Sequence, residues 1–247
     1  SNRARLKQQR VVSEVGAQAL TTVDLDRVLQ LAASRVGDVL GADSVSILEW
    51  GDGPGTFRVA AATGWATTYV NEYIDADEMT QSMQTYQRGQ PVVVDDFETD
   101  DRFDHSEDFA SAGFRSGMSA PVGGDASRWG IIGAHSVEPG QFTDEDVLFL
   151  KNIATVVAAA AERSELRTAL SEVLERIDEA VVAFDPNWNL TYANATAEHL
   201  FEEPAADLLG RQMMALTPEV GGFREGFRAA MRTQETREFE AYSEDSE

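Results

Sequence analysis

The chain has 247 residues, 43% of them hydrophobic, and carries 43 Asp and Glu against 20 Lys and Arg, for a formal net charge of -23. This length and hydrophobic content can fill one large core or two modest ones, which excludes a disordered tail. The chain has no cysteine, which excludes disulfides, thiolate catalysis, zinc–thiolate and iron–sulfur sites, and thioether-linked bilin or flavin.

The charge pattern is unusual in that Lys7 and Lys151 are the only lysines, while acidic residues are spread over the whole length. This pattern resembles that of proteins from salt-accumulating, halophilic archaea; an ordinary acidic mesophilic protein is the alternative. In molar salt the Debye length falls to about 3 Å, so surface carboxylates repel one another little. Because phosphate binding needs clustered Lys and Arg, we expect no direct contact with nucleic acid.

No apolar run approaches the roughly 18 to 20 residues that span a bilayer, and no signal peptide opens the chain. We therefore expect a cytoplasmic protein without a membrane span. The chain opens on Ser1 and Asn2 without an initiator Met, so we expect it to be part of a longer protein.

Apolar spacing predicts a charged amphipathic helix over residues 3–20 and a second helix over 25–40. Strands at 44–50 and 56–63 flank a glycine-rich turn, as in an antiparallel pair. The next predicted elements are a helix at 79–89, a strand at 91–94, an acidic irregular segment at 95–116, and strands at 117–122 and 129–137.

A long helix is predicted between Gly140 and Pro186, because neither glycine nor proline occurs between them. Thr143, followed by three acidic residues, is a typical helix start. Helical periodicity continues to Asp178, which gives about 36 residues and roughly 54 Å. Few globular domains need such a helix internally, so we expect it to connect two domains.

Apolar residues on this helix recur at the alternating three- and four-residue spacing of a coiled coil. A first seam comprises Leu150, Ile153, Val157 and Ala160, and a second seam comprises Leu166, Leu170, Val173 and Ile177. The two seams are out of phase by one residue, with a break near Arg163. The pattern predicts a homodimer through a helical bundle; a monomer whose seam packs on its own domain is the alternative.

After the long helix, strands are predicted at 180–184 and 190–193 around a turn at 185–189. Short helices follow from Asn194, then a helix at 223–231 and the start of a strand at 235–242.

Three segments carry a family resemblance: GFRSGMSAPV at 113–122, RWGIIGAHS at 128–136 and FTDEDVLFL at 142–150. In this order and spacing they resemble the C-terminal half of GAF domains, and the upstream elements extend the resemblance to residues 21–163. The region is similar to the kind of GAF domain that is found beside PAS domains in bacterial and haloarchaeal sensor histidine kinases and regulators. It implies an α+β fold, an antiparallel sheet flanked by helices.

Residues 174–218 resemble the first half of a PAS domain, with the turn DPNWN at 185–189, LTYAN at 190–194 and AADLLG at 205–210. The expected organisation is an N-terminal helix at 1–20, a GAF domain at 21–163, its exit helix and connector at 143–178, and a partial PAS domain at 179–247.

The GAF resemblance implies a ligand held between one sheet face and the variable segments at 79–89 and 95–114. Aromatic, Met and small polar side chains there could line an apolar pocket. The candidate ligand contacts are Ser46, Met79, Met83, Phe97, Phe109, Phe114, Met118, Ala120 and His135. A satellite core of phenylalanines, with His135 as a packing residue, is the alternative.

We expect no catalytic residue, metal site or cofactor, because no triad, metal-ligand cluster or phosphate-binding loop occurs. Haem bound through His105 is the alternative, since haem needs one imidazole and an apolar slot. The polar neighbours of His105 favour a solvated loop instead. The GAF region lacks the cyclic-nucleotide signature, and His199 does not match a kinase phosphoacceptor helix.

The predicted function is sensing and dimerisation, relaying ligand or redox state through the helix to an output domain outside this chain, such as a histidine kinase with its response regulator. The chain itself is not expected to be an enzyme. The alternatives are a structural dimerisation and protein-interaction module without a ligand, and the sensor part of a transcriptional regulator resembling the bacterio-opsin activator.

Overall fold

The computed structural model describes residues 2–51, 53–77, 80–125 and 127–212, together with 229, 232 and 233. The chain forms two compact units, Ser1–Leu166 and Arg167–Glu247. The helix predicted at 223–231, apart from residue 229, and the strand predicted at 235–242 lie outside the described residues.

The first unit opens with two helices, α1 (Asn2–Thr21) and α2 (Leu25–Leu40). The side chain of Asp24 caps α2 by accepting a hydrogen bond from the backbone N–H of Arg27 at 3.2 Å. The helix ends at Gly41, whose φ of 63° is the left-handed conformation that glycine adopts without strain.

A six-stranded sheet forms the centre of this unit, in the order β3-β2-β1-β6-β5-β4, and every neighbouring pair is antiparallel. The strands are β1 (Ser44–Trp50), β2 (Thr56–Gly64), β3 (Tyr73–Asp75), β4 (Val92–Val94), β5 (Ser116–Gly123) and β6 (Arg128–Ser136). This architecture confirms the predicted α+β fold class.

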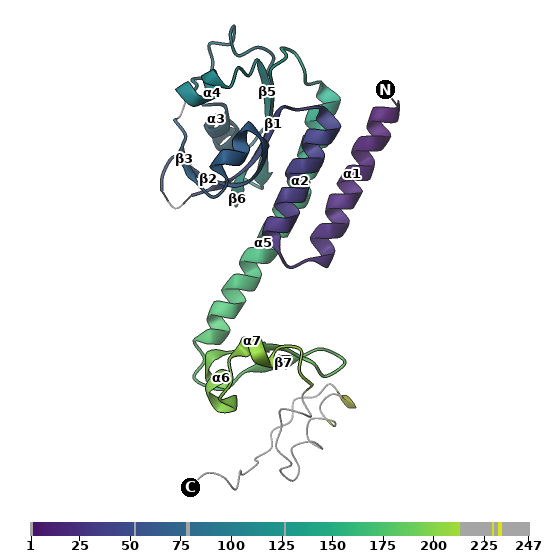
Figure 1. Cartoon of the computed structure of the whole chain (residues 1–247), viewed down its shortest axis with the longest axis vertical. Helices are drawn as coiled ribbons and strands as arrows, with labels where there is room; N and C mark the ends of the chain where they lie inside the picture. Colours follow the sequence, from purple (N-terminus) through teal and green to yellow (C-terminus); the bar gives the residue numbers. More distant parts are fainter. Residues whose placement is uncertain are drawn as a thin grey trace. The chain divides into compact units, whose positions relative to one another are not determined.

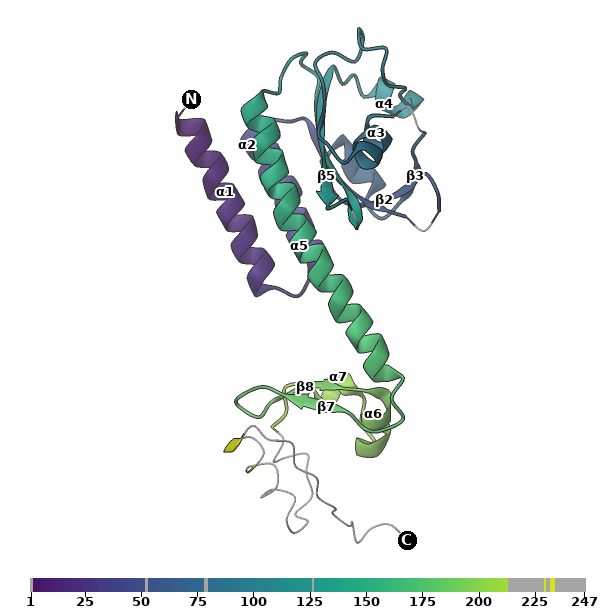
Figure 2. The ribbon, with the colours of Figure 1, turned by 180° about the vertical axis from the view of Figure 1, so that it is seen from behind.

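Helices cover both faces of the sheet (Figures 1 and 2). The helices α2 and α5 (Asp144–Glu175) lie on one face, with α1 beside them. The other face carries α3 (Gln81–Arg88), α4 (Glu107–Ser111) and the 3-10 helix η1 (Trp65–Tyr69), with the loops that join them. We call this second side the cavity face.

Strand alternation decides which residues reach each face. The main core, under α2 and α5, takes alternate residues from three strands: Val45 and Ile47, Met118 and Ala120, Ile132 and Ala134. The residues that alternate with them along the strands, such as Ser46 and His135, therefore point to the cavity face.

Helix α5 is close to its predicted extent, since it runs from Asp144 to Glu175 where 143–178 was predicted. Thr143 and Asp146 close its first turn, because the Asp146 carboxylate accepts hydrogen bonds from the backbone N–H and the hydroxyl of Thr143 at 3.0 and 2.7 Å. No helix in the described part of the chain is both long and apolar enough to cross a membrane.

The two predicted seams of α5 differ in burial. The first seam is buried in the unit's own core, so these residues behave as the monomeric alternative expects. In the second seam Leu166, Leu170 and Val173 are 66%, 59% and 59% exposed. At the break between the seams, Arg163 donates a hydrogen bond to the carbonyl of Thr22.

In the second unit, β7 (Val182–Phe184) and β8 (Leu190–Ala193) form an antiparallel pair, followed by α6 (Ala195–Phe201) and α7 (Ala205–Leu208). A small core gathers Leu190, Ala193, Ala197 and Leu208. The predicted turn is closed by one side chain, since the Asp185 carboxylate accepts hydrogen bonds from the backbone N–H groups of Asn187 and Asn189, each at 2.8 Å.

The end of α5 is held by Asn194, which is fully buried. Its amide group donates to the carbonyls of Leu174, Ile177 and Glu179 at 3.1, 3.3 and 2.9 Å. Its side-chain oxygen accepts from the N–H of Val181 at 2.9 Å. One side chain thus satisfies backbone groups that the helix end would otherwise leave unpaired.

Candidate functional site

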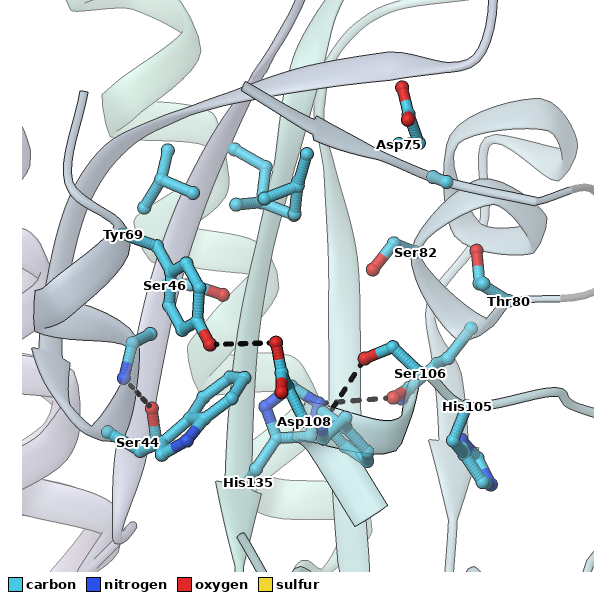
Figure 3. Close-up of a pocket in the computed structure, with 18 of the residues that line it drawn as sticks. Ser44, Ser46, Tyr69, Asp75, Thr80, Ser82, His105, Ser106, Asp108 and His135 are labelled. Atoms are coloured by element: carbon cyan, nitrogen blue, oxygen red, sulfur yellow. Dashed lines mark hydrogen bonds between the residues drawn. The ribbon is translucent and has the colours of Figure 1, made fainter. Parts of the chain in front are cut away.

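A cavity of about 310 Å³ lies on the cavity face, between β1, β2 and β6 of the sheet and the layer of η1, α3 and α4 above it (Figure 3). Strand β3 and the segment before α4 complete its wall. Its size falls at the lower end of the roughly 300 to 1,000 Å³ that is usual for small-molecule pockets.

Two serines of β1 belong to the wall of the cavity. Ser44 is buried, and its hydroxyl is hydrogen-bonded within the fold. It donates to the carbonyl of Thr63 at 3.1 Å and accepts from the N–H of Ala66 at 3.2 Å. Ser46 forms no hydrogen bond with any described residue, so its hydroxyl is available to a ligand. Gly133, its partner on β6, has no side chain to fill the space beside it.

His135 projects from β6 into the cavity wall (Figure 3). Its Nε2 atom is 3.3 Å from Oε1 of Gln81, and the amide nitrogen of Gln81 donates to the carbonyl of Val92 at 3.2 Å. The Val92 carbonyl thus orients the amide so that its oxygen faces the imidazole, which favours the tautomer protonated at Nε2. Burial lowers the pKa of His135 to about 4, with the nearby His105 a second cause, so the ring is neutral at pH 7.

Aromatic rings surround both histidines. The ring centroids of Phe97 and Phe109 lie 6.1 and 5.0 Å from that of His135, and 4.8 and 5.4 Å from that of His105. Burial among these rings lowers the pKa of His105 as well. Gly117 allows this packing, because a Cβ there would lie 2.7 Å from Cδ2 of His135 and 2.9 Å from Cζ of Phe97.

Three carboxylates, which we call the rim carboxylates, line the cavity with exposed side chains: Asp75, Asp104 and Asp108. Asp108 accepts a hydrogen bond from the phenol of Tyr69 at 3.3 Å (Figure 3). Partial burial and then this carboxylate raise the pKa of Tyr69. No Lys or Arg among the described residues lines the cavity.

Four of the nine residues predicted from the sequence line this cavity: Ser46, Phe97, Phe109 and His135. Phe114 lies behind them, with its ring centroid 5.5 Å from that of His135.

The other candidates lie elsewhere. Met118 and Ala120 must be corrected, because they belong to the core under α2 and α5 on the opposite face of the sheet. Met83 does not line the cavity but is buried in a second cluster beneath α3, beside Leu48 and Phe57. Met79 lies outside the described residues.

The sequence reasoning missed the polar and aromatic residues that loops bring to the cavity, among them Trp65, Tyr69, Gln81 and the rim carboxylates. The glycine at position 64, just before η1, was the only local signal for this turn. Its φ is 65°, and a Cβ there would lie 1.9 Å from the carbonyl oxygen of Asp43, so the turn requires glycine.

Within the described residues, no three acidic or histidine side chains are placed to hold a metal ion together. The haem alternative through His105 stays a prediction. A haem there would need room beside an imidazole that Phe97 and Phe109 already contact.

Comparison with protein families matches residues 24–161 to the GAF domain and residues 174–247 to the PAS fold. Comparison with curated proteins gave no match.

Solved structures resemble the first unit. The GAF domain of a phosphoenolpyruvate-protein phosphotransferase from Coxiella burnetii is 17% identical, with a TM-score of 0.60, over 67% of this chain and 98% of that one. Free methionine-R-sulfoxide reductase from Neisseria meningitidis, in complex with its substrate, is 20% identical, with a TM-score of 0.58, over 68% and 95%. The phycocyanobilin-bound GAF domain of a cyanobacterial phytochrome is 20% identical, with a TM-score of 0.55, over 65% and 96%. At these identities the likeness shows the fold.

Proposed function

Since this chain belongs to the GAF domain family and carries a PAS-fold region after it, we propose that it is a sensor that binds a small molecule in the cavity. Occupancy of the cavity is relayed along α5 to an output domain, which we take to be a histidine kinase or a transcriptional regulator in a cytoplasmic, halophilic setting. The chain itself performs no catalysis in this proposal.

The observation that carries the proposal is the cavity itself, where the Ser46 hydroxyl has no partner among the described residues and a neutral His135 meets aromatic rings. A satellite core, the alternative expected from the phenylalanines, would leave no space of about 310 Å³ beside them. Two of the solved GAF-like structures hold a small molecule, a substrate in one and phycocyanobilin in the other. A similar fold thus accommodates more than one ligand.

The relay follows from strand alternation. His135 faces the cavity, while its neighbour Ala134 and the nearby Ile132 pack in the core shared with α2 and α5. A ligand that shifts β6 therefore shifts the surface on which α5 rests. It changes the output only if it binds two arrangements of the helix with different affinity.

We propose further that a homodimer forms through the second seam of α5. Leu166, Leu170 and Val173 are exposed at coiled-coil spacing, whereas the first seam is already occupied by the chain's own core. Light scattering in dilute and in molar KCl tests this. Leu170→Glu should give a monomer, while Leu148→Glu, an equally exposed leucine on α5 outside that seam, should leave the dimer intact. A monomeric wild-type chain under both conditions would refute the dimer.

Native mass spectrometry of the purified chain, followed by a thermal-shift screen of small molecules, tests the sensor proposal. We expect a retained or stabilising compound that is lost in Ser46→Phe, because the new ring enters the cavity from β1. Ser13→Phe, an exposed serine of α1, is the matched control. If no compound binds and Ser46→Phe is more stable than wild type, the cavity is a packing defect and not a ligand site. The structural dimerisation module is then the better description.

A further inference from the structure

The charges around the cavity are of one sign. The rim carboxylates come from β3, from the segment before α4 and from α4 itself, and no Lys or Arg among the described residues faces the cavity with them. The two histidines that line it have lowered pKa values, so neither supplies a positive charge at pH 7.

The rim carboxylates also differ from acids nearby in the first unit. Asp96 and Asp100 are paired with Arg115 and Arg102, with N···O distances of 2.6 and 2.5 Å. Within the described residues the rim carboxylates have no such partner. Their convergence on a cavity, and not their number in so acidic a chain, is what points to a ligand.

Below the rim the cavity is aromatic. Trp65, Tyr69, Phe97 and Phe109 line it, and the faces of such rings carry negative partial charge that attracts cations. Trp65 and Tyr69 pack together with ring centroids 5.0 Å apart, beside Asp108, which accepts the Tyr69 hydrogen bond. An ammonium group here would meet a carboxylate and ring faces together, while a carboxylate or phosphate would meet only repulsion and lost hydration.

The volume of the cavity limits the size of the ligand. About 310 Å³ corresponds to roughly ten water molecules at about 30 Å³ each, enough for one ring or branched chain with a short polar arm. The apolar lower wall, which includes Leu48 and Val59, suits the body of such a compound.

From these observations we infer that the cavity selects a small organic cation, a primary or secondary ammonium with an aromatic or branched apolar body. The inference rests on the proposed sensor function and names its ligand class. The ammonium lies beside Asp108 with Trp65 and Tyr69, and the apolar body lies toward Leu48 and Val59.

Isothermal titration calorimetry on the full chain tests this with three probes that share one body: 2-phenylethylammonium, 2-phenylethanol and 3-phenylpropanoate. The ammonium should bind about tenfold or more tightly than the alcohol, and the carboxylate should not bind measurably. The same three forms of an indolylethyl body repeat the comparison. Because the rim is exposed, the preference for the ammonium should shrink between dilute and molar KCl, while the affinity for the alcohol should not weaken.

Variants locate the effect. Asp108→Asn retains an acceptor for Tyr69 but removes the charge, and it should weaken ammonium binding about tenfold while leaving the alcohol unchanged. Asp75→Asn should act in the same direction. Asp101→Asn removes an equal charge from an exposed site on the same acidic segment that does not line the cavity, and it should have little effect.

The outcomes separate this inference from the sensor proposal. Equal or tighter binding of the alcohol or the carboxylate overturns the ligand class and leaves a sensing cavity. An equal effect of Asp101→Asn and Asp108→Asn also overturns it, because the preference would then come from the net charge of the chain. If no ammonium probe binds while the thermal-shift screen finds a neutral or anionic ligand, the ligand class alone fails; if nothing binds at all, both fail.

Discussion

Replacing His135 by Gln should flatten the pH dependence of stability of the first unit. The folded chain holds this imidazole with a pKa of about 4, whereas an exposed histidine titrates near 6.5. Between these pH values the imidazole of His135 is protonated in the unfolded chain but not in the folded chain, so acidification favours unfolding. Above pH 6.5 neither state is protonated and the effect vanishes.

The size of the effect follows from the two pKa values. Each unit of difference is worth about 1.4 kcal/mol, so the full loss is roughly 3 kcal/mol once the pH falls below 4. From about pH 7.5 to about pH 5, the wild-type chain should lose about 2 kcal/mol of unfolding free energy more than His135→Gln. His105, whose pKa burial also lowers, contributes in the same direction and remains in both proteins.

Urea unfolding monitored by tryptophan fluorescence measures this difference. Three of the four tryptophans belong to the first unit, so a Trp188→Phe background confines the signal to it. His199→Gln, in the second unit, should leave the pH dependence unchanged. Equal losses for wild type and His135→Gln would refute the reasoning, because His135 would then be able to take up a proton in the folded state as readily as in the unfolded one.

Three further predictions concern packing, the end of α5 and salt. Gly117→Ala should destabilise the first unit by about 1 to 3 kcal/mol, measured by the same urea assay, because its Cβ would enter the contact between His135 and Phe97. Asn194→Ala removes a buried side chain with several hydrogen bonds, which should lower the stability of the second unit by roughly 3 kcal/mol. Amide hydrogen exchange around residues 174–181 should become faster. Asn187→Ala, which changes an exposed side chain, should leave that exchange unchanged. The urea midpoint of the first unit should rise between 0.15 and 2 M KCl, about the range over which the Debye length falls from 8 Å to below 3 Å; an unchanged midpoint would argue against a halophilic surface.

The sheet and the long helix could be predicted because their signals are local. Alternation and glycine-rich turns located β1, β5 and β6 to within about two residues, and the acidic turn after Thr143 located the start of α5. The strand β3, the helix α4 and η1 were missed, because they have three to five residues and lack the apolar run that located the equally short β4.

The residues that line the cavity were predicted only in part, because assigning a strand residue to one face of the sheet requires the pairing register between neighbouring strands. Ser46 pairs with Gly133, and Gly133 pairs with Ser119 on β5, so Ser119 shares the cavity face while Met118 does not. A shift of one residue reverses every such assignment, and the sequence of one strand does not specify its register with the next. The rim carboxylates could not be predicted for a different reason, since only the folded chain brings Asp75, Asp104 and Asp108 to the wall of one cavity.

The size of the cavity also limits how the sensor can work. Moving a two-state equilibrium from 1:99 to 99:1 requires a ligand that prefers one state about ten-thousandfold, or about 5.5 kcal/mol. A compound of roughly ten atoms would have to contribute about 0.5 kcal/mol per atom to that preference alone, which is a large share of what small ligands achieve in total binding. A hundredfold preference, about 2.7 kcal/mol, is better matched to a cavity of about 310 Å³, and it suffices only if the two states of α5 are already within about tenfold of each other. The exposed second seam fits such a balanced helix, because it takes no part in the core that fixes the first seam.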